Sequence, residues 1–303
     1  MATKAPIRVK SIAEYHRLRG LPKPQHPLVS VISLDEMDNS SSHDEHLVLD
    51  FYSIAMKRCL ETKIQYGQQE YDFDEGVMFY IAPDQVFHVR VNPNSKRSGW
   101  MLLVHPDFLW NTNLAKDIKK YEYFDYAVHE ALFLSDKEEQ TLEEIYKNIR
   151  DEYHSNIDKF SQSIIISQIE TLLNYSDRFY QRQFITRKIT NHQIVDRLDD
   201  LLTDYFNTAD IASKGLPTVQ HIAETLNVSP NYLSGLLKTL TGQSTQQHIH
   251  NKLIDKAKER LSATNLSVSE IAYELGFEHP QSFSKLFRSK TNLSPLEFRQ
   301  SFN

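Results

Sequence analysis

The chain has 303 residues, of which 40% are hydrophobic and 11% aromatic, and its net charge is −6. This composition is typical of globular protein and excludes a disordered chain. No apolar run approaches the roughly 20 residues of a membrane-spanning helix, and the basic N-terminus lacks the apolar core of a secretory signal. Cys59 is the only cysteine, which excludes an internal disulfide and a cysteine zinc cluster. We therefore expect a cytoplasmic protein of about two domains, with no membrane partner.

The first part of the chain, residues 1–134, is predicted to consist mainly of short strands and turns. Its apolar clusters are separated by turn residues such as Gly67, Pro83-Asp84 and Ser98-Gly99. The clusters cover residues 29–32, 46–56, 64–66, 76–81, 87–91 and 100–104. Many short strands at this spacing indicate a β-barrel or sandwich.

Residues 135–190 are predicted to form two amphipathic helices. Ser135 and Glu138 fit a capping box at the start of the first helix. The second helix begins near Phe160 and is apolar over a wide arc, so the pair packs either on the β-domain or on a second copy of the chain. We interpret the basic and aromatic segment 181–188 as a joint.

The last part, residues 191–303, begins with a predicted helix over about 191–206 and then contains an imperfect repeat. One copy starts at Thr218 (TVQHIAETLNVSPNYLSGLLKTLTGQS) and the other at Ser267 (SVSEIAYELGFEHPQSFSKLFRSKTNLS). A helix over about 244–261 separates them. From Thr218 onward 9 basic residues face 7 acidic ones, which indicates weak non-specific attraction to DNA.

Each copy has the pattern of a helix-turn-helix. A small residue, Ala223 or Ala272, occupies the first helix where a crossing helix approaches closely, and the turn holds Asn227 or Gly276, which tolerate a left-handed backbone. In the second helices the expected buried stripes are Leu233, Leu236, Leu237 and Leu240 in copy one, and Phe283, Leu286 and Phe287 in copy two.

The opposite faces of these second helices carry residue types that read base edges and phosphates. The predicted DNA-binding residues are Ser229, Asn231, Tyr232, Ser234, Gly235 and Lys238 in copy one, and His279, Gln281, Ser282, Lys285 and Arg288 in copy two. If both helices enter one face of the DNA, they lie roughly one helical turn, about 34 Å, apart.

The segment from about His192 to Phe302 resembles the AraC/XylS DNA-binding domain, most clearly in SVSEIAYELGFEHPQSFSKLFRSKTNLSPLEFR. Asn292 stands where that family usually has glycine, and Gly235 stands where it usually has a larger polar residue. The resemblance implies an α+β protein whose C-terminal all-α domain has two helix-turn-helix units joined by a linker helix. Gly235 puts the base readout of the first unit in doubt.

The segment YDFDEGVMFYIAPDQVFHV, from Tyr71, resembles the cupin-like regulatory domain of many such proteins. The resemblance implies that this domain binds a small effector or mediates homodimerisation. Aromatic residues that are candidates to line an effector pocket are Phe51, Tyr52, Tyr66, Phe79, Phe87 and Trp100, although core packing explains them more simply.

We expect a double-stranded DNA operator as partner, RNA polymerase as a further partner of an activator, and no catalytic residue, metal or cofactor. The alternatives are a regulator without a small ligand and a metal-dependent cupin enzyme fused to a DNA-binding module. The histidines of the first half, including His43, His46, His88 and His105, lack the His-x-His pattern followed by a spaced glutamate that the enzyme needs.

Overall fold

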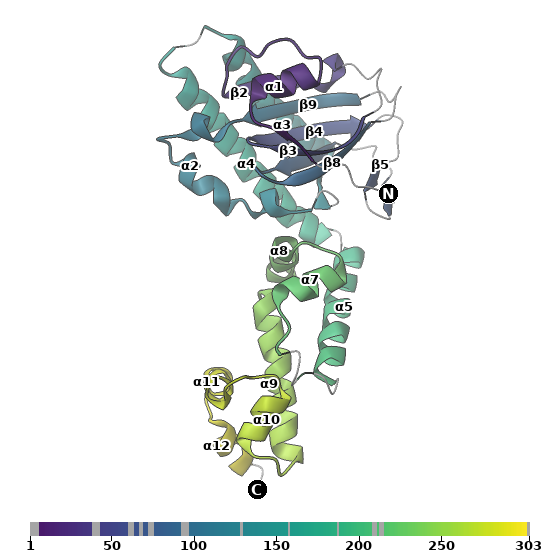
Figure 1. Ribbon diagram of the computed structural model, residues 1–303, viewed down its shortest axis with the longest axis vertical. Coiled ribbons are helices and arrows are strands. Elements are labelled where there is room, and N and C mark those ends of the chain that lie inside the picture. Colours follow the sequence, from purple (N-terminus) through teal and green to yellow (C-terminus); the bar gives the residue numbers. More distant parts are fainter. Residues whose placement is uncertain are drawn as a thin grey trace. The chain divides into compact units, whose positions relative to one another are not determined.

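The computed structural model describes residues 6–37, 43–59, 64–66, 69–71, 76–91, 97–127, 130–156, 158–186, 188–207, 211 and 215–301. The chain divides into two compact units, unit 1 (Met1–Gln183) and unit 2 (Phe184–Asn303). The described sheets lie in unit 1, whereas unit 2 is helical (Figure 1). The predicted α+β class is confirmed, and the finer division into residues 1–134, 135–190 and 191–303 stays a prediction.

Unit 1 is built around two sheets. The larger sheet is antiparallel, with strand order β10-β7-β4-β9-β2, and the smaller has the order β1-β3-β8, in which β1 and β3 are parallel. The strands are β1 (Ile7–Val9), β2 (Val29–Ser33), β3 (His43–Leu49), β4 (Tyr52–Cys59), β7 (Val77–Ile81), β8 (Val86–Val91), β9 (Arg97–Val104) and β10 (Leu132–Phe133). A separate hairpin pairs β5 (Ile64–Tyr66) with β6 (Gln69–Tyr71).

Both faces of the larger sheet are covered, which explains why β7 reads as the unbroken apolar run VMFYI. On one face the buried Trp100 of β9 stacks on Tyr146, with ring centroids 4.4 Å apart. On the other face Ile32 and Leu103 join a core with Leu47 and Phe51 from the β3 strand and the turn after it. The first half is therefore a layered β-structure, as predicted.

The short helix α1 (Ile12–Leu18) was not predicted, because the first residues were interpreted as strands and turns. Its signals are present in the sequence: the Ser11 side chain accepts a hydrogen bond from the Glu14 backbone, as an N-cap does. Ile12 and Tyr15 are then buried in the core between the sheets. Seven residues give too short a periodic pattern to distinguish a helix from an irregular segment.

The helical pair of unit 1 is α3 (Asp136–His154) and α4 (Ser161–Thr186). The predicted capping interaction is present, because the Glu138 carboxylate accepts from the Ser135 backbone at 2.9 Å. The predicted apolar stripe of α3 is buried within unit 1, whereas Phe160 and Ile164 near the start of α4 are 57% and 42% exposed. The predicted joint at 181–188 is wrong in its first part, since α4 continues as a helix to Thr186.

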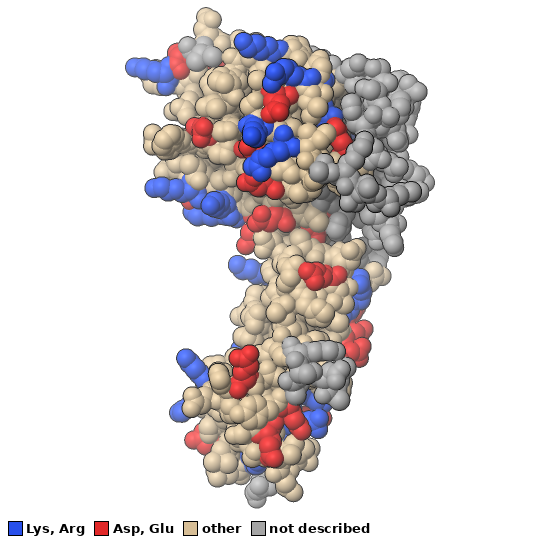
Figure 2. Space-filling model, viewed as in Figure 1, with Lys and Arg blue, Asp and Glu red and all other residues tan. Residues whose placement is uncertain are grey.

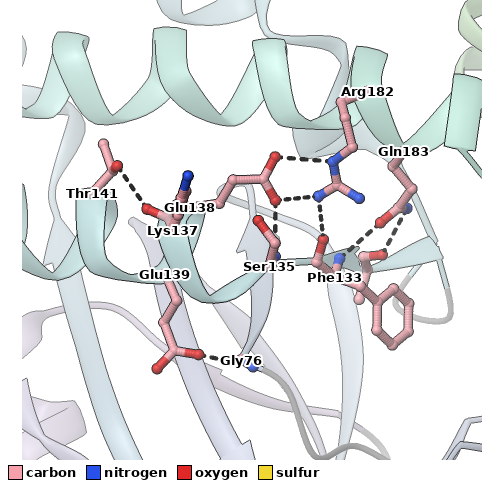
Figure 3. A network of polar contacts seen from close by, with 10 residues as sticks. Gly76, Phe133, Ser135, Lys137, Glu138, Glu139, Thr141, Arg182 and Gln183 are labelled. Carbon is pink, nitrogen blue, oxygen red and sulfur yellow. Dashed lines mark hydrogen bonds and ion pairs between the residues drawn. The ribbon is translucent and has the colours of Figure 1, made fainter.

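A polar network explains why the helix continues (Figure 3). The Arg182 guanidinium, near the end of α4, binds the Glu138 carboxylate and donates to the Phe133 carbonyl at 2.7 Å. The neighbouring Gln183 accepts from the Phe133 backbone at 2.8 Å and donates to the Ala131 carbonyl at 3.2 Å. Residues that the sequence marks as basic and polar are thus fixed by the sheet edge and by α3.

Unit 2 contains α5 (Lys188–Asn207) and six shorter or equal helices among its described residues. They are α7 (Val219–Leu226), α8 (Pro230–Thr241), α9 (Thr245–Ala263), α10 (Val268–Glu274), α11 (Pro280–Thr291) and α12 (Pro295–Gln300). In unit 1, α2 (Leu114–Asp117) and short 3-10 turns complete the described helices. Within the parts of the chain that the structure describes, no helix combines the length and apolarity that crossing a membrane requires.

We expect Arg182→Ala to lower the free energy of unfolding of unit 1 by about 1–3 kcal/mol, because it leaves the mostly buried Glu138 carboxylate without its charged partner. The fluorescence of Trp100 during urea unfolding of a Trp110→Phe background measures this, since the chain has two tryptophans. The control Arg150→Ala removes an exposed arginine that binds Asp151 on its own helix, and we expect a change within about 0.5 kcal/mol. Equal effects of the two variants contradict a stabilising role for the network.

Candidate nucleic-acid interface

The two repeat copies form two helix-turn-helix units, α7–α8 and α10–α11. The Thr218 and Ser267 side chains cap the first helices by accepting from the backbones of His221 and Glu270, at 3.1 and 3.2 Å. Ser229 caps α8 by accepting from the Tyr232 backbone at 3.2 Å. Each of these three helices therefore begins where a short polar side chain satisfies a free N–H group.

The turns have the left-handed backbone that their residue types predict. Asn227 has φ 59° and ψ 45°, and Gly276 has φ 83°. A Cβ atom at Gly276 would lie 2.9 Å from the Gly215 backbone and 3.0 Å from the Ile211 side chain, so glycine is required here by space as well as by φ. Asn292, where the resembled family usually has glycine, is also left-handed, at φ 61°.

Small residues let the paired helices approach closely. Ala223 and Ala272 are fully buried, as are Leu233, Leu236 and Leu237 of α8. Phe283 and Phe287 are the buried residues of α11. The expected stripes were too wide at two positions, because Leu240 and Leu286 are only half-buried. Each unit therefore has a closed apolar core that fixes which face of its second helix remains outside.

In copy one the predicted contact residues are mostly engaged within the protein. The Tyr232 ring is 8% exposed and packs edge-to-face on Phe184, so it belongs to the core rather than to the outer face. The Ser234 hydroxyl lies 3.1 Å from the Thr245 hydroxyl of α9. Asn231 and Gly235 are half-buried, and Lys238 is exposed.

In copy two the predicted contact residues share one property, since all of them are exposed: His279, Gln281, Ser282, Lys285 and Arg288. An open hollow beside them is lined by Lys285, Arg288, Ser289 and Asn292. Ser289 and Asn292 are not among the predicted DNA-binding residues. Helix α11 carries Lys285, Arg288 and Lys290 and no acidic residue, whereas α8 carries one cation, Lys238. In Figure 2 basic side chains project beside α11, and acidic ones lie over the neighbouring α10.

Helix α9 connects the two helix-turn-helix units and contacts α8, α10, α11 and α12. Its Ile249, Leu253, Ala257 and Leu261 recur at helical spacing and are buried. Lys252 donates to Asp199 of α5 at 2.9 Å. Burial lowers the pKa of His248, against a smaller opposing effect of Asp199, and burial and the nearby Lys290 both lower the pKa of His250.

Arg299 on α12 has a structural role that its sequence position did not predict. Its guanidinium donates to the Leu261 carbonyl at 3.1 Å and to the Leu266 carbonyl at 2.6 Å. Leu261 is near the end of α9 and Leu266 is in the loop before α10. One side chain therefore holds the loop that leads into the second helix-turn-helix unit. The sequence does show an arginine shortly after the Ser294-Pro295 pair, but its spacing does not reveal which carbonyl groups it binds.

In unit 1 the candidate pocket aromatics are engaged in packing. Phe51 is buried in the core cluster against which the half-buried Phe87 packs, and Tyr52 packs on Phe124 with ring centroids 5.1 Å apart. Phe79 lies under the Lys57 ammonium, 4.9 Å from it, and Trp100 stacks on Tyr146. The side chain of Tyr66 lies outside the described residues.

Of the histidines in the first half, His46 and His88 face each other across β3 and β8, with stacked rings 4.7 Å apart. His105 caps a 3-10 turn by accepting from the Asp107 backbone at 3.2 Å. The side chain of His43 lies outside the described residues. Among the residues that the structure does describe, no three His, Cys, Asp or Glu side chains gather as metal ligands would.

Comparisons with known proteins agree on the C-terminal region. Residues 222–301 match a family described as a helix-turn-helix domain. The HTH-type transcriptional regulator YfiF of Bacillus subtilis is 26% identical over 77% of this chain and 71% of its own length. The HTH-type transcriptional activator RhaS of Escherichia coli is 37% identical, but the match covers 26% of this chain and 28% of that relative.

A solved C-terminal domain of AraT, a response regulator from Geobacillus stearothermophilus, is 32% identical over 36% of this chain and 84% of that domain, with a TM-score of 0.32. The family and sequence matches confirm the predicted DNA-binding helix-turn-helix domain in the C-terminal third.

We expect Gly276→Ala to destabilise unit 2 more than Gly242→Ala does. Both glycines have positive φ, at 83° and 73°, so both variants incur the cost of a left-handed alanine, about 1–2 kcal/mol. Only at Gly276 does the added Cβ meet neighbouring backbone, because nothing lies within 4 Å at Gly242. Thermal unfolding followed by far-UV circular dichroism measures both, and equal losses would show that the close approach to Gly215 contributes nothing.

Proposed function

We propose that this chain, a DNA-binding transcription regulator with an AraC-type helix-turn-helix domain at its C-terminus, binds an operator with two half-elements through α8 and α11. The observation that carries the proposal is the pair of similar units on one connecting helix, each with a second helix whose outer face is polar. Such a helix docks in the major groove of DNA.

The two helix-turn-helix units contribute unequally to DNA binding in this proposal. All five predicted contact residues of α11 and its N-cap are exposed, and its three cations are not offset by acidic residues on the same helix. Helix α8 has one exposed cation, Lys238, and half-buried Asn231 and Gly235. We therefore assign base readout mainly to Gln281, Lys285 and Arg288, and backbone positioning mainly to α8.

Unit 1 controls DNA binding in the same proposal, either by binding a small effector or by pairing with a second copy. The packing of Phe51, Tyr52, Phe79 and Trp100 against named neighbours favours a core role for these aromatics over a ligand-lining role. Control by pairing is therefore favoured over a pocket formed by these side chains. RNA polymerase is a partner only if the protein activates transcription.

The experiment that tests this control compares operator binding and sedimentation of the full-length protein over a range of protein concentrations. Pairing predicts that DNA affinity and dimer fraction rise together. Concentration-independent binding by a monomer that strengthens on addition of a small metabolite mixture supports an effector instead.

Selection from a random DNA library tests the operator proposal directly. We expect the purified full-length protein to enrich a motif with two half-elements about one helical turn apart, with the stronger base preference in one of them. Enrichment of a single half-element means that one unit contacts only the DNA backbone. An absence of enrichment at every salt concentration, with binding that is also insensitive to salt, contradicts DNA recognition.

Single substitutions then identify the reading side chains. We expect Gln281→Ala and Lys285→Ala each to reduce discrimination between the selected and a mismatched operator by about 1–3 kcal/mol, whereas Lys238→Ala weakens binding to both sequences alike and lowers the salt slope by about 1. Arg150→Ala, an exposed arginine of unit 1, is the control for loss of one positive charge. Uniform weakening by Lys285→Ala would reassign that residue to a phosphate.

A further inference from the structure

One side chain, Asn251, connects both helix-turn-helix units. It lies near the middle of α9 and is half-buried. Its amide N–H donates to the side-chain amide oxygen of Gln243 at 2.8 Å, and Gln243 lies two residues after Thr241, the last residue of α8. Its own carbonyl oxygen accepts from the Lys290 ammonium at 3.3 Å, and Lys290 is in the last turn of α11.

The donors and acceptors of this bridge are consistent with one orientation of the amide. The nitrogen faces an acceptor and the oxygen faces a cation that can only donate, so a flipped Asn251 would lose both interactions. Aspartate is the substitution that keeps an acceptor for Lys290, while the Gln243 amide turns its own N–H toward the carboxylate. Alanine keeps neither interaction.

Copy one has other connections to α9, whereas those of copy two are sparser near this point. Thr241 at the end of α8 lies 2.9 Å from His248, and Ser234 lies 3.1 Å from Thr245. The second helix-turn-helix unit is held at the far end of α9, where Arg299 donates to the Leu261 carbonyl. Among the described residues, the Lys290–Asn251 contact is thus a hydrogen bond that joins the end of α11 to the middle of α9.

We propose that Asn251 is a positioning residue that sets the separation and rotation of α8 relative to α11, and so the spacing between half-elements that the protein accepts. This inference rests on the proposed operator of two half-elements. Two rigid reading helices tolerate one spacing on DNA, because each added base pair both lengthens the site and rotates the second groove. Loss of the bridge leaves each helix-turn-helix unit folded on its own core and packed on α9, and removes one restraint on the placement of α11 relative to α8.

The test measures affinity of the full-length protein for the selected operator and for two versions with one base pair inserted or removed between half-elements. We expect Asn251→Ala to reduce the preference for the selected spacing by about two- to tenfold, the fold-change that corresponds to one hydrogen bond. Asn251→Asp is expected to restore the preference. Affinity for an isolated half-element should not change with either variant.

The matched control is Gln246→Ala on the same helix, because Gln246 contacts His250 of its own helix at 2.9 Å and neither reading helix. It should keep the spacing preference of the parent protein. If Asn251→Ala also keeps it, while the parent and the variant bind both half-elements, the positioning role is overturned but the proposed function stands. If the parent enriches no DNA motif at all, the proposed function fails.

An increase of affinity for all DNA sequences after Asn251→Ala, without a change in spacing preference, would also overturn the inference. It would mean that the bridge withholds the Lys290 ammonium from phosphate and does not fix geometry. Unfolding curves of each variant accompany these measurements, and an Asn251→Asp variant that folds like the parent but lacks its spacing preference counts against the proposal as well.

Discussion

The apolar stripe of α9 is the constraint on which the rest of unit 2 depends. Ile249, Leu253 and Ala257 are completely buried, and both helix-turn-helix units pack against this one helix. At about 1.5 Å per residue, its 19 residues span about 28 Å, a length similar to one turn of B-DNA. Each helix-turn-helix unit has only a small core of its own, and both units pack on α9. The length of α9 therefore limits the distance between them.

The repeat is symmetric in its backbone and asymmetric in its surface. Caps, left-handed turns and buried alanines recur in both copies, because these features are needed for any helix-turn-helix to close. The outer residues differ: Ser234 is bonded to α9 and Tyr232 is in the core, whereas Gln281 and Lys285 are free of such burial. The two copies share the residues that folding requires but differ on their outer faces. This difference is consistent with the proposal that one helix-turn-helix unit reads bases and the other contacts the DNA backbone.

How far the sequence predicts this molecule depends on how local each signal is. The caps and turns of the two helix-turn-helix units are predictable from sequence, since Ser229, Asn227 and Gly276 act through hydrogen bonds and φ angles within a few residues. The burial of Tyr232 was not, because its partner Phe184 lies 48 positions earlier in the chain. The bridge at Asn251 likewise joins residues up to 39 positions apart.

The same distinction explains the errors in unit 1. The seven residues of α1 are too few to show helical periodicity against a background of strands. The extension of α4 depends on Arg182 and Gln183, whose partners Glu138, Phe133 and Ala131 are 44 to 52 positions away. A basic, polar sequence is ordinarily typical of an exposed connection, and only the sheet edge converts this one into an anchored helix.

The anchored end of α4 also bears on the proposed control of DNA binding by unit 1. The boundary between the compact units falls inside α4, directly after Gln183. Arg182 and Gln183 are bonded to β10 and α3, while the next residue, Phe184, is fully buried and packs on Tyr232 of α8. A ligand or partner copy shifts DNA binding only if it binds one arrangement of this segment better than another. The residues that hold α4 in unit 1 therefore directly precede, along the chain, the residue that packs on α8 in unit 2.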